Sequence, residues 1–285
     1  MKTLFGGIKM TWKKVIIFAL IAGAFTALMA ICVPEGNSFH EIAVHLEAWI
    51  LFAVIIITNC EKPAEAALKT FVFFLISQPL VYLIQVPFAG MGFGIFMYYK
   101  YWFIITLLTL PGGFIAWYIK KDNILSALIL SIALVMLIAQ GVTYFKDTTV
   151  YFPRHIVSTV FCFGVVLLFL FGILHSRKTR LIAGIICLAA VLFFGYRAFS
   201  QPSFYTNRII DLDKSRYPID GTWTVRVENE KISEAKIHDW GNNDWDLEVF
   251  FHEMGPNTVI LTDGSGKEYR LIVSFDRSGE ATVQE

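Results

Sequence analysis

The sequence predicts a bundle of seven transmembrane α-helices followed by a small all-β antiparallel domain, and three observations lead to this fold class. Hydrophobic residues make up 56% of the 285 residues and charged residues only 16%, against about 25% in typical soluble domains. Long apolar runs fill the first 200 residues. After residue 218 the pattern changes to the alternation of apolar and polar residues that is typical of half-buried strands.

Seven apolar stretches are long enough, or nearly so, to cross a hydrocarbon core of about 30 Å, which takes roughly 20 helical residues. Together they make up a bundle over residues 1–200. The stretches lie at about residues 15–33, 42–59, 67–88, 101–119, 124–144, 155–174 and 181–199. The first follows two lysines, as a signal peptide would, but its apolar run is long and no small-residue cleavage site follows. We therefore expect it to be a retained helix.

The basic residues between these stretches predict the orientation of the chain. Eleven Lys and Arg residues lie on the side of the N-terminus and four on the opposite side. Because positively charged loops favour the cytoplasm, we expect a multi-pass plasma-membrane protein with a cytoplasmic N-terminus. Seven crossings then place the C-terminal domain outside the cell. The chain holds no N-glycosylation sequon, and we expect a bacterial source.

The stretch TNCEKPAEAALKTF, residues 58–71, gathers charge between two apolar runs and is predicted to be a cytoplasmic turn. Pro63 suits the first position of a helix, and Glu65 suits the first turn, four residues before Lys69. A helix start explains the charges. The alternative is a cytoplasmic contact site for a partner that uses Glu61, Lys62 and Glu65.

Polar side chains occur inside the third to fifth stretches. Gln78 and Gln85 are seven residues apart and share a helix face, with Pro79 between them, and Gln140 lies in the fifth stretch. Amide side chains in a bundle often bond one helix to another. The alternative is that the three glutamines line a path for a ligand, as polar groups beside broken helices do in transporters. No acidic or basic residue is expected deep in a span, which weakens an ion-coupled or proton-relay mechanism.

No motif for catalysis or for a cofactor is found, and we expect a non-enzymatic protein without cofactors. The four cysteines match no zinc or redox spacing, and we expect them to be packing residues. Glu41 and His45 are four residues apart in SFHEIAVHLEAW, residues 38–49, without the spacing of a metal-binding helix. A solvated helix end is the expected structure there.

Residues 201–218 are predicted to form a polar linker, and residues 219–285 a small β-barrel or sandwich. Turn sequences such as DGSG separate six expected strands. These strands lie near residues 222–228, 234–239, 246–252, 258–262, 268–275 and 280–284. The segment from residue 204 onward holds 9 basic and 16 acidic residues, a balance of −7, which argues against nucleic acid as a partner.

The loop DWGNNDWD, residues 239–246, carries two kinds of candidate site. Trp240 and Trp245 are candidates for binding a partner or ligand, although core or rim positions would also explain them. Asp239, Asp244 and Asp246 are weak candidates for calcium ligands, because calcium prefers oxygen donors but the EF-hand spacing is missing. An ordinary turn is the simpler explanation of these acidic residues.

These patterns favour a non-enzymatic integral membrane protein of the cell envelope, whose bundle anchors an exported β domain that binds a partner or ligand. The alternative is a small-molecule transporter, or a membrane subunit of a transport complex, with a polar path through the third to fifth spans. The expected partners are membrane lipid and a protein in the membrane or envelope.

Overall fold

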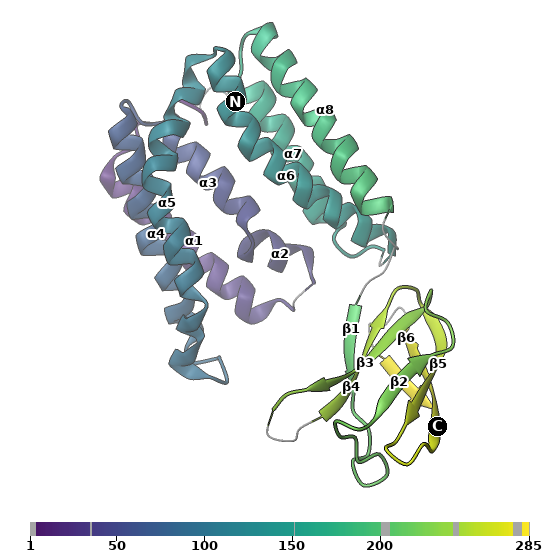
Figure 1. Ribbon diagram of the computed structural model, residues 1–285. Helices are drawn as coiled ribbons and strands as arrows, with labels where there is room; N and C mark the ends of the chain where they lie inside the picture. Colours follow the sequence, from purple (N-terminus) through teal and green to yellow (C-terminus); the bar gives the residue numbers. More distant parts are fainter. Residues whose placement is uncertain are drawn as a thin grey trace. The chain divides into compact units, whose positions relative to one another are not determined.

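The computed structural model describes residues 4–34, 36–150, 152–200, 206–241, 245–275 and 281–284. The chain divides into a helical unit, Met1–Tyr196, and a β unit, Arg197–Glu285. Figure 1 labels their helices and strands. The elements of the first part of the chain are α1 (Trp12–Cys32), α2 (Ser38–Val44), α3 (Leu46–Thr58), α4 (Pro63–Gln85), η1 (Gly92–Met97), α5 (Tyr99–Ala116), η2 (Trp117–Lys121), α6 (Ile124–Val150), α7 (Ile156–Gly172) and α8 (Arg177–Ser200).

Five of the described helical segments are long and apolar enough to cross a membrane: α1, α4, the stretch Gly92–Lys121, α6 and α8. The number rises to six if α2 and α3, which meet at an angle of 49°, form one broken span. The apolar helix α7 has 17 residues and is shorter than these. A membrane-inserted bundle is therefore supported, while the count of seven spans stays a prediction.

The second expected span, residues 42–59, is broken at His45. This residue has an extended backbone, with φ −83° and ψ −179°, and it ends α2 and begins α3. The helix cannot continue through such a residue, because helical hydrogen bonds need both dihedral angles in the helical region. The break separates Glu41 on α2 from Glu47 on α3.

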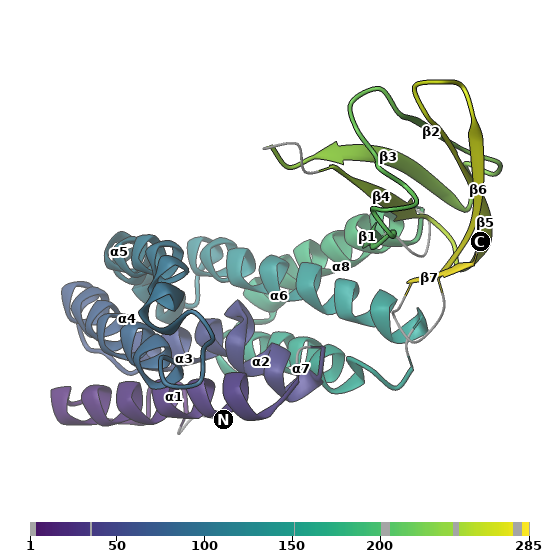
Figure 2. The same cartoon turned by 90° about the horizontal axis from the view of Figure 1, so that it is seen from below.

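The helices pack in two groups, with α2 and α3 between them. Figures 1 and 2 both show α1, α4 and α5 side by side, and α6 beside α7 on the other side of α3. Small residues allow the closest approaches. A Cβ atom on Gly23 would lie 2.8 Å from the carbonyl oxygen of Ser77, and one on Gly113 would lie 3.1 Å from the Cα of Ala67. Such contacts between backbones are the usual way in which membrane helices associate.

The β unit contains seven described strands in two antiparallel sheets. Their order is β1-β4-β3 in one sheet and β2-β5-β6-β7 in the other. Buried alternating residues such as Leu247, Val249, Leu271 and Val273 form its core. The strands are β1 (Thr206–Ile210), β2 (Thr224–Val227), β3 (Ser233–Asp239), β4 (Trp245–Phe251), β5 (Gly255–Thr262), β6 (Glu268–Phe275) and β7 (Ala281–Gln284).

The six strands expected from the sequence correspond to β2–β7, but β1 lies inside the expected linker, residues 201–218. It pairs with β4 from Thr206↔Phe251 to Ile210↔Leu247. The side chains of β1 do not alternate between apolar and polar, so the sequence lacks the period that marks a strand. The pairing depends on backbone groups, which the pattern of side chains does not reveal. Tyr217, also in the expected linker, is buried against Tyr269, with ring centroids 5.6 Å apart.

Candidate functional site

The three glutamines singled out in the spans line two adjoining cavities of the helical unit. Gln78 and Gln85 line a cavity of about 520 Å³ between α1, α2, α3, α4 and α5, here called the glutamine cavity. Gln140 lines a second cavity of about 520 Å³, here called the carboxylate cavity because it contains Glu47. Val44 and Trp102 line both. Each cavity is of the size that small-molecule sites usually have.

The glutamine cavity contains two buried hydrogen-bond donors with no acceptor among the described residues. These are the Nε2 amide of Gln78, whose residue is 2% exposed, and the Nε1 of Trp49, whose residue is 1% exposed. An unmet buried donor costs about 1–3 kcal/mol. Gln85 differs, because its amide donates to the Val81 carbonyl of its own helix at 3.1 Å. Gln78 and Trp49 are therefore the side chains of this cavity wall whose donors lack an acceptor among the described residues.

Aromatic side chains form much of the remaining wall of the glutamine cavity. Tyr82, Tyr98, Tyr101 and Trp102 come from α4, from the residue between η1 and α5, and from α5. Their rings offer flat apolar surfaces with a few polar edges. A ligand that suits this wall has an apolar or ring-shaped body and an oxygen that accepts from Gln78 and Trp49.

The carboxylate cavity places an acidic side chain where the sequence predicted none. Glu47 is 3% exposed and lies in the first turn of α3, and its Oε1 accepts a hydrogen bond from the Tyr144 hydroxyl at 3.0 Å. Glu41 is 8% exposed, and its carboxylate lies 3.2 Å from Nδ1 of His45. Residues 38–49 are thus a partly buried segment and not a solvated helix end. The acidic residues appear solvated in the sequence because they stand before an apolar run.

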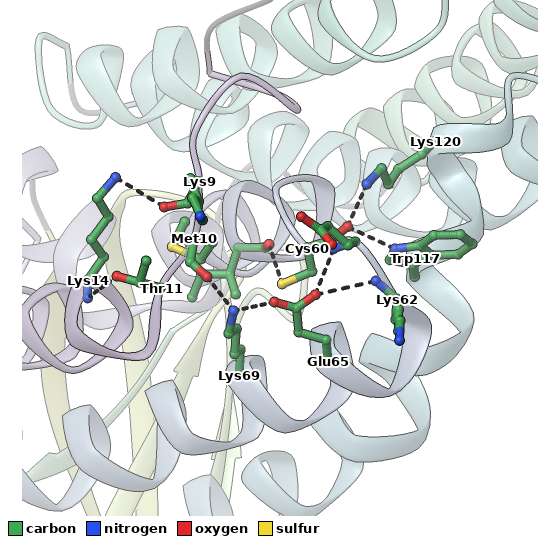
Figure 3. Close-up of polar contacts among 12 residues, drawn as sticks. Lys9, Met10, Thr11, Lys14, Cys60, Lys62, Glu65, Lys69, Trp117 and Lys120 are labelled. Carbon is green, nitrogen blue, oxygen red and sulfur yellow. Dashed lines mark hydrogen bonds and ion pairs between the residues drawn. The ribbon is translucent and has the colours of Figure 1, made fainter.

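The charged turn that follows α3 holds the N-terminal segment in place (Figure 3). The carboxylate of Glu65 accepts from the backbone N–H groups of Glu61 at 2.8 Å and of Lys62 at 3.4 Å. It also pairs with Lys69, which is 4% exposed and donates to the carbonyl of Met10. Glu65 therefore has a structural role at the start of α4. Glu61 and Lys62 are exposed, and their use by a partner stays a prediction.

Cys60 is the second anchor of this turn. Its carbonyl accepts from Nε1 of Trp117 at 3.0 Å and from Nζ of Lys120. Its thiol donates to the carbonyl of Ile56 at 3.2 Å, and burial raises the pKa of the Cys60 thiol to about 11. A thiol of this kind is a poor nucleophile near neutral pH. A cavity of about 670 Å³ lies between this turn and residues 6–12, but many of its polar groups already have partners within the chain.

The two tryptophans of the predicted β-domain site lie on opposite faces of one sheet. Trp245 pairs with Asp239 in the register of β3 and β4, on the face of buried Leu247, while Trp240 lies against His238 with ring centroids 4.0 Å apart. The structure does not bring Trp240 and Trp245 together on one face, and their use in binding stays a prediction. Trp240 is 52% exposed and remains a candidate for binding.

A buried carboxylate lies beside Trp240 on the outer face of this sheet. Glu248 accepts from the side-chain amide of Asn207 at 2.7 Å and pairs with Lys236 at 3.2 Å and His238 at 3.1 Å. The hydrogen bond from Asn207, followed by those from Lys236 and His238, lowers the pKa of Glu248 despite its burial.

The acidic residues considered for calcium do not share one surface. Asp239 accepts from the backbone N–H of Gly241 at 2.8 Å, and Asp246 lies 3.7 Å from Nζ of Lys214. Asp239 and Asp246 occupy opposite faces of the sheet by their register, and Asp244 lies outside the described residues. Within the described ranges, no group of three His, Cys, Asp or Glu side chains is suited to a metal ion.

No family model, curated protein or solved structure matches the chain. The function is therefore inferred from the geometry of the cavities and of the sheet face.

Proposed function

We propose that the protein binds a small uncharged molecule in the glutamine cavity and carries it into or across the membrane, alone or as the membrane subunit of a transport complex. The observation that carries the proposal is the pair of unmet donors, Gln78 Nε2 and Trp49 Nε1, in one cavity. A buried polar group without a partner is destabilising, so its presence favours a ligand that supplies the acceptor. The ligand class is a partly apolar molecule with a carbonyl, ether or hydroxyl oxygen.

The proposed topology has seven crossings, with the bent pair α2–α3 as the second and α7 as the sixth. The 17 residues of α7 extend about 26 Å at 1.5 Å per residue. Local thinning of the bilayer accommodates a span that is a few ångströms short. With a cytoplasmic N-terminus, an odd number of crossings puts the β unit outside the plasma membrane of a bacterium. We propose no catalytic activity.

A second candidate function is binding of an envelope partner or ligand by the β unit, with the helical bundle as its anchor. It is supported by the outer face of the sheet that contains β3 and β4, where exposed Trp240 lies beside His238 and buried Glu248. Aromatic side chains that are exposed beside polar groups are common in binding surfaces.

The test uses the full chain, purified in mild detergent from its native membrane, with bound small molecules identified by native mass spectrometry. Wild type is expected to retain an oxygen-bearing molecule. Trp49→Phe keeps the aromatic ring and removes the N–H, and Gln78→Leu removes the amide. Both are expected to lose most of the bound molecule.

Gln85→Leu is the matched control, because Gln85 lines the same cavity but donates to its own helix. It is expected to retain the molecule. Equal retention by Trp49→Phe, Gln78→Leu and wild type would contradict the proposal and favour packing as the role of these side chains.

A further inference from the structure

Glu47 is a buried carboxylate for which neither ligand binding in the glutamine cavity nor packing provides a role. It is 3% exposed and lines the carboxylate cavity. Its Oε2 has no hydrogen-bond partner among the described residues, and its Oε1 has the hydroxyl of Tyr144. A site with an unmet, nearly fully buried oxygen needs an occupant.

The surroundings of Glu47 favour a proton as that occupant. The other cavity walls are largely apolar, with Leu46, Ile105 and Met136 among them. Moving an ionised carboxylate from water into such a site without a cation costs several kcal/mol, whereas the neutral acid is far less costly. Protonation also turns one carboxyl oxygen of Glu47 into an O–H donor, and the neighbouring oxygen of Tyr144 can accept a hydrogen bond from it.

A chain of hydrogen bonds connects Glu47 to the surface. The Tyr144 hydroxyl is 3.0 Å from Oε1 of Glu47 and 3.0 Å from Nδ1 of His45. The side chain of His45 is 48% exposed, and the same Nδ1 lies 3.2 Å from Glu41. Every step from solvent to the buried carboxylate is therefore within hydrogen-bonding distance.

The titratable groups that face Glu47 come from several elements. Glu41 and His45, on α2 and at its junction with α3, act on it electrostatically, and Tyr144 comes from α6. Cys162 on α7 is also within electrostatic range of Glu47. On α5, the cavity wall is formed by Trp102 and Ile105, neither of which titrates.

A second group of charges lies farther from Glu47, around Glu41. Asp147, His155 and Arg154 interact with one another, and both Asp147 and His155 lie within electrostatic range of Glu41. His155 also stacks on the ring of Tyr144, with ring centroids 5.5 Å apart, so this group acts on the middle of the hydrogen-bond chain as well as on its outer end. The residues that line the carboxylate cavity do not include these three.

We propose that Glu47 is a proton-binding site that loads and unloads through Tyr144 and His45. A hydronium ion from solvent gives a proton to Nε2 of His45 and leaves a water molecule, while Nδ1 gives its proton to the oxygen of Tyr144. The Tyr144 hydroxyl passes its own proton to Glu47 in the same step. The histidine ends as the Nε2–H tautomer, no tyrosinate forms, and the one added proton neutralises the Glu47 carboxylate. The reverse sequence releases it.

This site adjoins the glutamine cavity through Trp102 and Val44 but does not depend on a ligand there. If the proposed transport is correct, the proton site supplies its coupling to the proton gradient. Its test therefore measures Glu47 in the full chain with no added ligand, so that its failure and the failure of ligand binding are separate results.

The first experiment is infrared difference spectroscopy across a pH titration of the full chain in lipid nanodiscs. Wild type is expected to show the carbonyl absorption of a protonated, buried carboxylic acid that disappears at high pH. Glu47→Gln is expected to lack this absorption, and the decrease is expected to correspond to one carboxyl group per chain. Glu61→Gln, at an exposed position, is the matched control and is expected to keep the wild-type signal.

Identical spectra of wild type and Glu47→Gln would overturn the proposal. Loss of the wild-type signal when NaCl replaces KCl at constant pH would also overturn it, because Glu47 would then be a sodium site. If Glu47→Gln does not fold, Glu47→Asp serves instead, since it keeps a carboxyl group and is expected to shift the position of the absorption.

The second experiment tests the route. After transfer to D₂O, the carboxyl absorption of Glu47 shifts as its proton exchanges. Tyr144→Phe removes the central hydroxyl and is expected to slow this exchange by about 10²-fold. Tyr196→Phe is the matched control, because Tyr196 is 77% exposed, and it is expected to exchange at the wild-type rate. An unchanged rate in Tyr144→Phe would exclude the route through Tyr144.

Discussion

Lys69 on α4 donates a hydrogen bond to the main-chain carbonyl of Met10, and so attaches the segment before α1 to the start of α4 (Figure 3). The ammonium also pairs with Glu65 one helical turn earlier. The same end of the bundle is closed by Asn59, whose side-chain oxygen accepts from the backbone N–H groups of Gly6 and Ile8 at 3.0 and 2.7 Å. The charged turn is thus a structural junction between three parts of the chain.

Lys69→Met is expected to lower the free energy of unfolding by about 3 kcal/mol, because it leaves the Met10 carbonyl without its donor and removes the cation that pairs with the Glu65 carboxylate. Thermal unfolding of the purified chain in detergent measures the change. Lys62→Met, at an exposed position in the same turn, is the control and is expected to unfold like wild type. Equal stability of the two variants would show that the Lys69 contacts add nothing.

Gly23→Ala is expected to destabilise the packing of α1 on α4 by about 1–3 kcal/mol, because the new methyl group would lie 2.8 Å from the Ser77 carbonyl oxygen. Gly184→Ala is the control, since a Cβ atom on Gly184 meets no atom within 4 Å and alanine favours a helix. Thermal unfolding should therefore separate the two variants, with Gly184→Ala at or slightly above wild type.

The stability of the β unit is expected to fall in acid in part through Glu248. Its pKa is lowered in the folded state by Asn207, Lys236 and His238. A carboxyl of this kind stabilises the fold above its unfolded pKa, near 4.3, and the contribution is lost as the pH falls through the lower folded pKa. Urea unfolding followed at pH 7 and at pH 3 measures the loss.

Glu248→Gln is expected to be less stable than wild type at pH 7 and to lose less on acidification. Glu268→Gln is the control, because Glu268 and its partner Arg226 are both largely exposed and such pairs contribute little. The same pH dependence in Glu248→Gln and wild type would contradict a role for Glu248.

Cys32 is expected to be the reactive thiol of the chain. It is exposed, whereas Cys60, Cys162 and Cys187 are buried. Because the pKa of Cys60 is raised to about 11, almost none of that thiol ionises at pH 7.5. A maleimide added to the purified protein should label Cys32 first, as peptide mass spectrometry would show, and Cys32→Ser should abolish rapid labelling.

The same cysteine tests the topology. Cys32 ends α1, so a cytoplasmic N-terminus puts it at the outer surface. A membrane-impermeant maleimide added to intact cells is expected to label it. Labelling only after the cells are lysed would reverse the predicted orientation.

The residue types of the site are visible in the sequence, but their environments are not. Gln78, Gln85 and Gln140 stand out as amides within apolar runs, and the structure places all three on cavities. What distinguishes Gln78 from Gln85 is the absence or presence of an acceptor, which depends on neighbours far along the chain. The burial of Glu47 is not predicted for a different reason. An acidic residue at the start of a helix is usually solvated, and the contact that buries Glu47 comes from Tyr144, 97 residues away.

The boundaries of helices and strands also depend partly on local sequence and partly on contacts with distant residues. Strand β6 begins and ends at the predicted residues because its apolar residues alternate and the DGSG turn precedes it. The break at His45 has no proline or glycine to announce it. At the break, Nδ1 of His45 lies 3.0 Å from the hydroxyl of Tyr144, a partner 99 residues away that the local sequence does not reveal.

The pairing of β1 with β4 decides how the β unit is to be produced in isolation. A fragment that starts at residue 219, the boundary that the sequence suggests, would lack β1. One edge of β4 would then present unpaired backbone groups, and open edges of this kind promote aggregation. Glu248 would also lose its hydrogen bond from Asn207, which lies in β1. A soluble version suitable for crystallisation or NMR should therefore begin before Thr206, near the end of the last helix.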